Sequence, residues 1–169
     1  MDDRGRDFIQ YIPRLRRYAR ALTGERARAD DLVQDTLERA LVKLHLWQPG
    51  SDLRAWLFTL MHNVFINQLR AQRNRLNTEL DGEAAEVAVR PTQNDRLELS
   101  DLQQALLRLP EEQREVLLLV GLEQMTYEET AGALAIPVGT VMSRLSRARE
   151  RLRGLLAGGV APATLKVVK

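Results

Sequence analysis

Apolar residues recur at helical spacing along two stretches of the chain, and no stretch alternates as a half-buried strand does. The first helical stretch covers residues 7–75. Residues 76–94 lose this periodicity and collect acids, glycine and proline, as flexible linkers do. The helical pattern returns over residues 95–156, and a tail of residues 157–169 follows. The pattern therefore predicts an all-α fold of two small helical domains joined by a flexible linker.

Composition narrows the class of protein. Of the 169 residues, 44% are apolar, which is enough to fill a core, but no window approaches the run of about 18 apolar residues that a membrane span needs. The polar start at Met1–Arg4 lacks the apolar stretch of a secretory signal. The absence of cysteine excludes disulfides and a thiolate metal site. We therefore expect a cytoplasmic protein without membrane insertion.

The positive charge is concentrated in one late segment. The formal net charge is only +2, yet five arginines fall within residues 144–153, where Glu150 is the only acid. Such a segment is typical of an anion-binding surface, and a solvated helix face is an equally good interpretation.

Residues 110–156 contain the start and stop signals of two short helices followed by a longer one. Pro110 and the acids after it suit a helix start. Thr126 and Glu129 form a capping-box pattern, in which the Thr126 hydroxyl caps the helix and Glu129 reaches back, and this predicts a helix over 127–134. Pro137 lies in a break, and a last helix is expected to begin near Val138.

The last helix has an apolar stripe and a polar, basic outer face at about 100° per residue. The stripe that must pack inward consists of Val141, Leu145, Ala148 and Leu152. A short helix, a tight turn and a second helix of this kind form a helix-turn-helix, whose second helix reads base edges in the major groove. Arg147 can bind guanine with two hydrogen bonds, and flanking arginines can bind phosphates. A plain helical hairpin with a basic face is the alternative.

Three segments in this block resemble region 4 of the extracytoplasmic-function sigma factors of bacterial RNA polymerase. They are Tyr127–Ala131, Pro137–Val141 and Ser143–Arg149. The resemblance implies that the helix-turn-helix binds the minus-35 promoter element. By position, the DNA-binding residues are Met142, Ser143, Arg144, Ser146, Arg147, Arg149 and Arg151.

Two positions depart from the family pattern. Ala135 stands where glycine is frequent, so a left-handed backbone there costs some free energy. Met142 stands where a basic residue is frequent, which indicates an altered minus-35 preference.

Residues 30–46 have the pattern of an amphipathic helix with an acidic outer stripe. The expected buried positions are Val33, Leu37, Ala40, Leu41 and Leu44, and the outer stripe consists of Asp31, Gln34, Asp35 and Glu38. Simple solvation can explain such a stripe. Residues 29–36, however, resemble region 2.2 of the same family, which docks on the β′ clamp helices of core RNA polymerase. The resemblance implies that the four stripe residues meet basic residues of the polymerase.

A loop at residues 47–53 and the helix after it carry a second set of nucleic-acid candidates. Asp52 is expected to cap this helix, which buries Leu57, Leu60, Met61 and Val64. Asn63, Asn67 and Arg70 follow one another at helical spacing and suit a single nucleic-acid strand. Trp47 and Trp56 can stack on bases, although a core position is the better interpretation for Trp56.

Leu53–Leu57 with His62-Asn63 resembles regions 2.3 and 2.4 of the family, where loop and helix capture a flipped-out base of the minus-10 element. Carried over by position, the minus-10 residues are Trp47, Gln48, Pro49, Ser51, Asn63, Asn67, Arg70 and Arg73. Many relatives have a basic residue where His62 stands, and a core role for His62 stays open.

The resemblance implies a sigma factor that binds core RNA polymerase through its β′ clamp helices and β flap. Such a protein directs the polymerase to promoter DNA, and an anti-sigma factor is a further implied partner. We expect no enzymatic activity, no cofactor and no metal site, because no catalytic constellation is present and His45 and His62 are isolated. An ordinary helix-turn-helix regulator and a sigma-like mimic that titrates an anti-sigma factor are the alternatives.

Overall fold

The computed structural model describes residues 3–80 and 101–158 of the chain. All regular structure in these two ranges is helical, in agreement with the predicted all-α class. The first range is called the first domain below and the second range the second domain. Most of the expected linker 76–94 and of the tail 157–169 lies outside the described residues, and residues 76–80 form the end of a helix.

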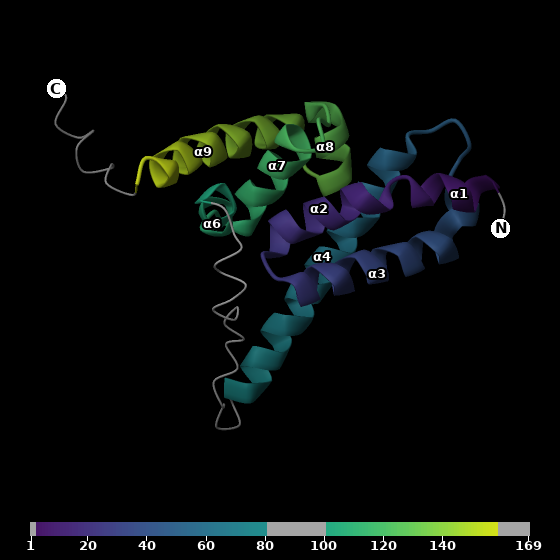
Figure 1. Cartoon of the computed structure of the whole chain (residues 1–169), viewed down its shortest axis with the longest axis horizontal. Helices are drawn as coiled ribbons and strands as arrows, with labels where there is room; N and C mark the ends of the chain where they lie inside the picture. The colour runs from purple at the N-terminus through teal and green to yellow at the C-terminus, as the bar shows by residue number, and fades with distance from the viewer. Residues whose placement is uncertain (1–2, 81–100, 159–169) are drawn as a thin grey trace.

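In the first domain two helices pack side by side and antiparallel, and a third, longer helix crosses them obliquely and extends beyond them (Figure 1). Its elements are α1 (Asp3–Ile9), α2 (Ile12–Thr23), α3 (Arg26–Lys43), the short 3₁₀ helix η1 (Leu44–Leu46) and α4 (Leu53–Leu80). Helix α2 ends at Gly24, whose φ of 73° few other residues adopt. Helix α4 begins at the expected cap, because Asp52 Oδ1 accepts hydrogen bonds from the N–H groups of Arg54 at 3.0 Å and Ala55 at 3.3 Å.

The core of the first domain follows the predicted apolar spacing with one exception. All four expected residues of α4 are buried, and Trp56 stacks on Phe8 with ring centroids 6.2 Å apart, which supports its assignment to the core. The exception is Leu41, which is 60% exposed, so its predicted burial is wrong. Ala40 occupies the inward position, and the next residue is turned about 100° away from it.

The second domain contains the predicted helix-turn-helix. Its elements are α6 (Asp101–Leu107), α7 (Glu111–Gly121), α8 (Tyr127–Leu134) and α9 (Val138–Leu156). Thr126 Oγ1 accepts the N–H of Glu129 at 3.0 Å, as a cap should. Ala135 has the left-handed conformation, with φ 54° and ψ 46°. The inward stripe of α9 is buried at Val141, Leu145 and Ala148, while Leu152 is partly buried against the same core.

The second half of the expected capping box is wrong. The carboxylate of Glu129 does not return to the start of its own helix but lies 3.0 Å from Nη2 of Arg54 in the first domain. A hydrogen bond to a cation is stronger than one to a neutral amide, so the guanidinium is the better partner.

The two domains pack directly against each other. Helix α8 lies against α4, and α6 and α7 lie against α2 (Figure 1). At the α2–α6 contact, a Cβ on Gly24 would lie 2.4 Å from Leu107 Cδ2, so a larger residue would have to displace the Leu107 side chain as well as adopt a left-handed backbone. None of the described helices is long and apolar enough to cross a membrane.

Replacing Ala135 with glycine is expected to stabilise the protein. A left-handed alanine costs about 1–2 kcal/mol, and the greater freedom of an unfolded glycine offsets about half of that gain. Chemical denaturation should therefore give Ala135→Gly a free energy of unfolding about 0.5–1 kcal/mol above that of the unmodified chain.

The matched control is Ala71→Gly, at an exposed helical position of α4. Glycine there should lower the free energy of unfolding by about 1 kcal/mol. A loss of stability at both positions would contradict the left-handed conformation of Ala135.

Candidate nucleic-acid interface

The outer face of α9 is open to solvent and rich in arginine. Six of the seven candidate residues on this helix are exposed: Met142, Ser143, Ser146, Arg147, Arg149 and Arg151. The Ser143 hydroxyl donates to the carbonyl of Thr140 at 3.2 Å. Arg144 differs, because its side chain is 27% exposed and its Nη2 lies 3.8 Å from Glu112 on α7. Arg144 therefore borders the face, and the other six form it.

A second polar face runs along α4. Asn63, Asn67 and Arg70 are exposed at the predicted helical spacing, and Arg73 follows them with its side chain 71% exposed. Asn67 also lines a groove of about 600 Å³ between α3 and α4. Amide and guanidinium groups therefore lie along one side of the helix, a pattern suited to a nucleic-acid strand.

The loop before α4 is only partly free. Gln48, Pro49 and Ser51 are exposed, and the Ser51 hydroxyl donates to the carbonyl of Gln48 at 2.6 Å. Trp47 packs against the core of the first domain, and its indole Nε1 is buried without a hydrogen-bond partner. The structure thus brings three loop residues to the surface and holds the fourth against the body of the domain.

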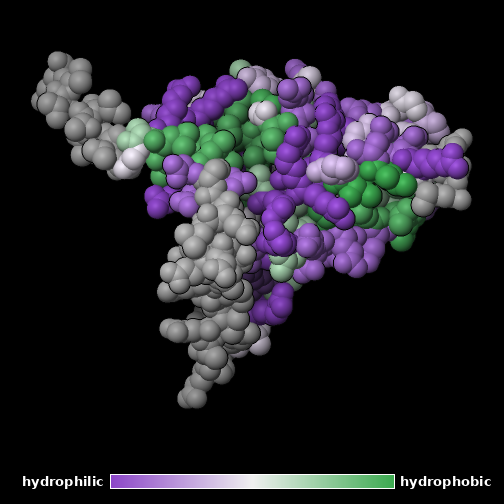
Figure 2. All heavy atoms as spheres, viewed as in Figure 1, coloured by the Kyte–Doolittle hydropathy of each residue, from purple (hydrophilic) through white to green (hydrophobic). Residues whose placement is uncertain are grey.

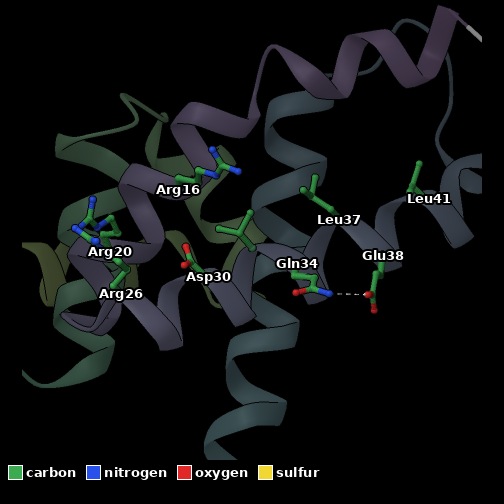
Figure 3. A pocket seen from close by; sticks show the side chains of 9 residues that line it. Arg16, Arg20, Arg26, Asp30, Gln34, Leu37, Glu38 and Leu41 are labelled. Atoms are coloured by element: carbon green, nitrogen blue, oxygen red, sulfur yellow. Dashed lines mark hydrogen bonds between the residues drawn. The ribbon is translucent and has the colours of Figure 1, made fainter. Parts of the chain in front are cut away.

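The acidic stripe of α3 forms a ridge between two grooves. Asp31, Gln34, Asp35 and Glu38 are all exposed, and Gln68 on α4 donates to Asp35 at 2.8 Å. The α3–α4 groove lies on one side of Glu38. On the other side is a groove of about 660 Å³ between α2 and α3, whose lining includes Arg16 and Arg20 of α2 and Arg26 of α3 (Figure 3).

The junction between the domains holds polar contacts that the sequence did not reveal. Arg54 binds Glu129 and donates to the backbone carbonyl of Glu123 at 3.1 Å. His62 Nδ1 lies 2.9 Å from Glu115, so this histidine belongs to neither the core nor the free face of α4. Arg17 lies 3.3 Å from Glu123. These partners are far apart in the sequence, and no local pattern connects them.

A buried arginine lies at the centre of this junction. The guanidinium of Arg114 donates to the carbonyls of Leu106, Leu107 and Leu109 in its own domain, at 2.8–2.9 Å, and to that of Leu22 in the first domain at 2.7 Å. Burial lowers the pKa of Arg114, while the carboxylates of Glu111 and Glu115 oppose that shift. The Leu106 carbonyl also accepts the N–H of Leu109 at 3.1 Å, and the other three lie at or just beyond helix ends, where carbonyls lack partners within the helix.

Two further buried polar groups lie in this junction. The Glu123 side chain is fully buried, and its Oε2 has no hydrogen-bond partner. Burial raises the pKa of the Tyr18 hydroxyl well above its usual value, and the nearby carboxylates of Glu115 and Glu123 raise it further. Tyr18 is therefore neutral at physiological pH. Among residues 3–80 and 101–158, no group of three or more His, Asp or Glu side chains could hold a metal ion.

Sequence comparison gives a consistent result for both domains. The family model for the Sigma2 domain of PhyR matches residues 8–62, and the model for sigma-70 region 4 matches residues 99–152. The chain is 42% identical over 150 residues to the ECF RNA polymerase sigma factor EcfG of Rhodopseudomonas palustris, covering 89% of this chain and 83% of that protein. It is 29% identical to the ECF sigma factor SigM of Bacillus subtilis, covering 90% and 94%.

Two solved structures resemble the whole arrangement. The sigma factor RpoE of Bartonella quintana, in complex with the anti-sigma factor NepR, has a TM-score of 0.75 and 36% identity over the full length of both chains. CnrH, in complex with the cytosolic domain of CnrY, has a TM-score of 0.69 and 28% identity, covering 92% of this chain and 88% of that one.

Removing the Arg114 guanidinium should strongly destabilise the protein. In Arg114→Met, four carbonyls lose the arginine as donor and only that of Leu106 keeps another, so the free energy of unfolding should fall by at least about 3 kcal/mol. Urea denaturation measures the change.

Arg108→Met is the control, because it removes an exposed arginine from the same connection between α6 and α7. It should change the free energy of unfolding by less than about 0.5 kcal/mol. Equal effects of the two substitutions would contradict the role given to Arg114.

Proposed function

The chain belongs to the extracytoplasmic-function sigma factors of RNA polymerase, and we propose that its two domains read two separate promoter elements. In this proposal α9 binds the minus-35 element through its outer face. Helix α4 and the loop before it bind the minus-10 element and hold a base extruded from the melting duplex.

One observation carries this proposal: two exposed polar faces suited to nucleic acid occur in separate domains of one chain. The face of α9 has the form of a major-groove reader, with hydroxyls and arginines on successive turns. The face of α4 combines amides with arginines, which suits a single strand. A regulator that binds only a duplex operator needs the first face alone.

We further propose that the acidic ridge of α3 docks on the β′ clamp helices of core RNA polymerase. The ridge is exposed along its length, and grooves on both sides leave it accessible to a partner helix. Opposite charges on the polymerase would speed the encounter and fix the register more than they add affinity.

An anti-sigma factor is the second proposed protein partner. Its support is the likeness to two sigma factors solved in such complexes, RpoE with NepR and CnrH with the cytosolic domain of CnrY.

A sigma-like mimic is the second candidate function, because the model that matches residues 8–62 describes the Sigma2 domain of PhyR. A mimic that only titrates an anti-sigma factor has no use for an exposed arginine face on α9. That face therefore favours promoter binding.

Reconstituted transcription with core RNA polymerase on a promoter library separates these functions. A sigma factor should give transcripts from promoters that share two spaced elements. The folded protein would give no promoter-specific transcript if it were a mimic or a regulator that acts without polymerase.

Arg147→Ala should weaken minus-35 binding by about 1–3 kcal/mol and relax the preference at one base position. Arg149→Ala removes an arginine from the edge of the same face, and it should weaken binding to all sequences equally, as loss of a phosphate contact does. Binding to a set of singly substituted minus-35 duplexes measures both variants. A uniform loss for Arg147→Ala would make that residue a phosphate contact.

Glu38→Lys should slow association with core polymerase by about tenfold or more at low salt, because it places a positive charge on the proposed docking ridge. Binding of a minus-35 duplex should stay unchanged. Asp7→Lys, an equal change of charge at an exposed position of α1, is the control. Stopped-flow association would contradict the docking proposal if both variants were slowed to the same extent.

A further inference from the structure

The ion pairs that join the two domains all have the same orientation of charge. In the described part of the chain, four of them have their basic side chain on the first domain and their carboxylate on the second. They are Arg17–Glu123 at 3.3 Å, Arg54–Glu129 at 3.0 Å, Arg73–Glu111 at 3.9 Å and His62–Glu115 at 2.9 Å, the last of which is an ion pair when His62 is protonated. Figure 2 shows hydrophilic residues gathered over this junction. The carboxylates of the second domain thus occupy the positions that an anionic ligand bound to the first domain would occupy.

Two of these basic side chains, His62 and Arg73, border the polar face of α4. At about 100° per residue, His62 and Arg73 lie within about 20° of each other around the helix. Asn63 and Arg70 lie about 80–100° further round. A nucleic-acid strand on Asn63 and Arg70 would therefore run beside the carboxylates that now hold His62 and Arg73.

We infer that the basic edge of α4 formed by His62 and Arg73 has two alternative partners. In the closed chain, in which the two domains pack against each other, this edge binds the carboxylates of Glu115 and Glu111. In the open chain, in which the two domains are separated, it binds the sugar–phosphate backbone of the DNA strand that α4 reads. This choice of partner rests on the proposed function. The second domain thus competes with nucleic acid for the first domain of its own chain.

The two exposed ion pairs, those of Arg17 and Arg73, are weak enough for such an exchange. Arg17 is 54% exposed and Arg73 is 71% exposed, and exposed pairs stabilise a contact little and weaken with salt. Glu123 is fully buried with one oxygen unpaired, so its desolvation opposes closure. A DNA strand offers a row of phosphates, and its binding also releases condensed counterions.

The distance between the domains tests this inference. The chain contains no cysteine, so Arg39→Cys on α3 and Glu150→Cys on α9 give two exposed sites for spin labels. Double electron–electron resonance then reports the closed and open populations of the full chain. We expect a single short distance at low salt, and a growing long-distance population as salt is raised or short single-stranded DNA is added.

Neutral substitutions isolate the ion pairs from general charge effects. Glu115→Gln with Glu129→Gln removes two of the carboxylates and should shift the ratio of open to closed chain by about tenfold. Glu112→Gln with Glu128→Gln makes the same change of charge on the same two helices, away from the junction. This control should keep the distances of the unmodified chain, and circular dichroism should show equal helix content in both variants.

The outcomes separate this inference from the proposed function. Equal distance distributions in the two double variants, or a distance that high salt leaves unchanged, would overturn the role of the carboxylates even if the protein directs transcription. Opening by salt but not by single-stranded DNA would overturn the inference that DNA and the second domain bind the same basic edge of α4. Loss of promoter-specific transcription with normal opening would count against the proposed function alone.

Discussion

The guanidinium of Arg114 holds together helix ends that belong to different domains. It binds three carbonyls around the end of α6 and one near the end of α2, and of these only the Leu106 carbonyl also accepts a backbone N–H, that of Leu109. Because α2 and α6 are fixed in this way, Leu107 lies against Gly24 and the carboxylates of α7 and α8 come within reach of α4. The closed arrangement of the chain depends on this one buried cation. The ion pairs around it set how strongly the two domains bind each other.

The closed arrangement affects the two polar faces differently. The outer face of α9 points away from the first domain and stays open. The face of α4 lies beside the acids of the second domain, and one of its borders is already bound by them. A sigma factor that reads two promoter elements must therefore separate its domains before α4 can use its full surface. A partner that favours the closed chain would keep α4 covered without touching α9.

Local patterns predicted most of the fold, and contacts between distant residues account for the rest. The stripe of α9 and the caps at Asp52 and Thr126 depend only on nearby residues, so the sequence showed them. Burial of Leu41 was predicted wrongly, because helical spacing does not show how wide a stripe the neighbouring helices cover. Glu129 was assigned to its own helix because Arg54 is distant in the sequence. Arg114 carried no signal, since its partners are backbone carbonyls. The structure exposes most of the candidate DNA and polymerase contacts, and their roles stay predictions.

A reversible covalent lock would test most directly whether the chain must open to work. A Cβ at residue 24 would lie 3.0 Å from Leu107 Cγ, so Gly24→Cys with Leu107→Cys places two sulfur atoms within bonding reach across the junction. With no other cysteine in the chain, oxidation can form only this intramolecular bond. In reconstituted transcription with core polymerase, the oxidised protein should give no promoter-specific transcript, and reduction of the same sample should restore it. Full transcription by the oxidised protein would contradict the account.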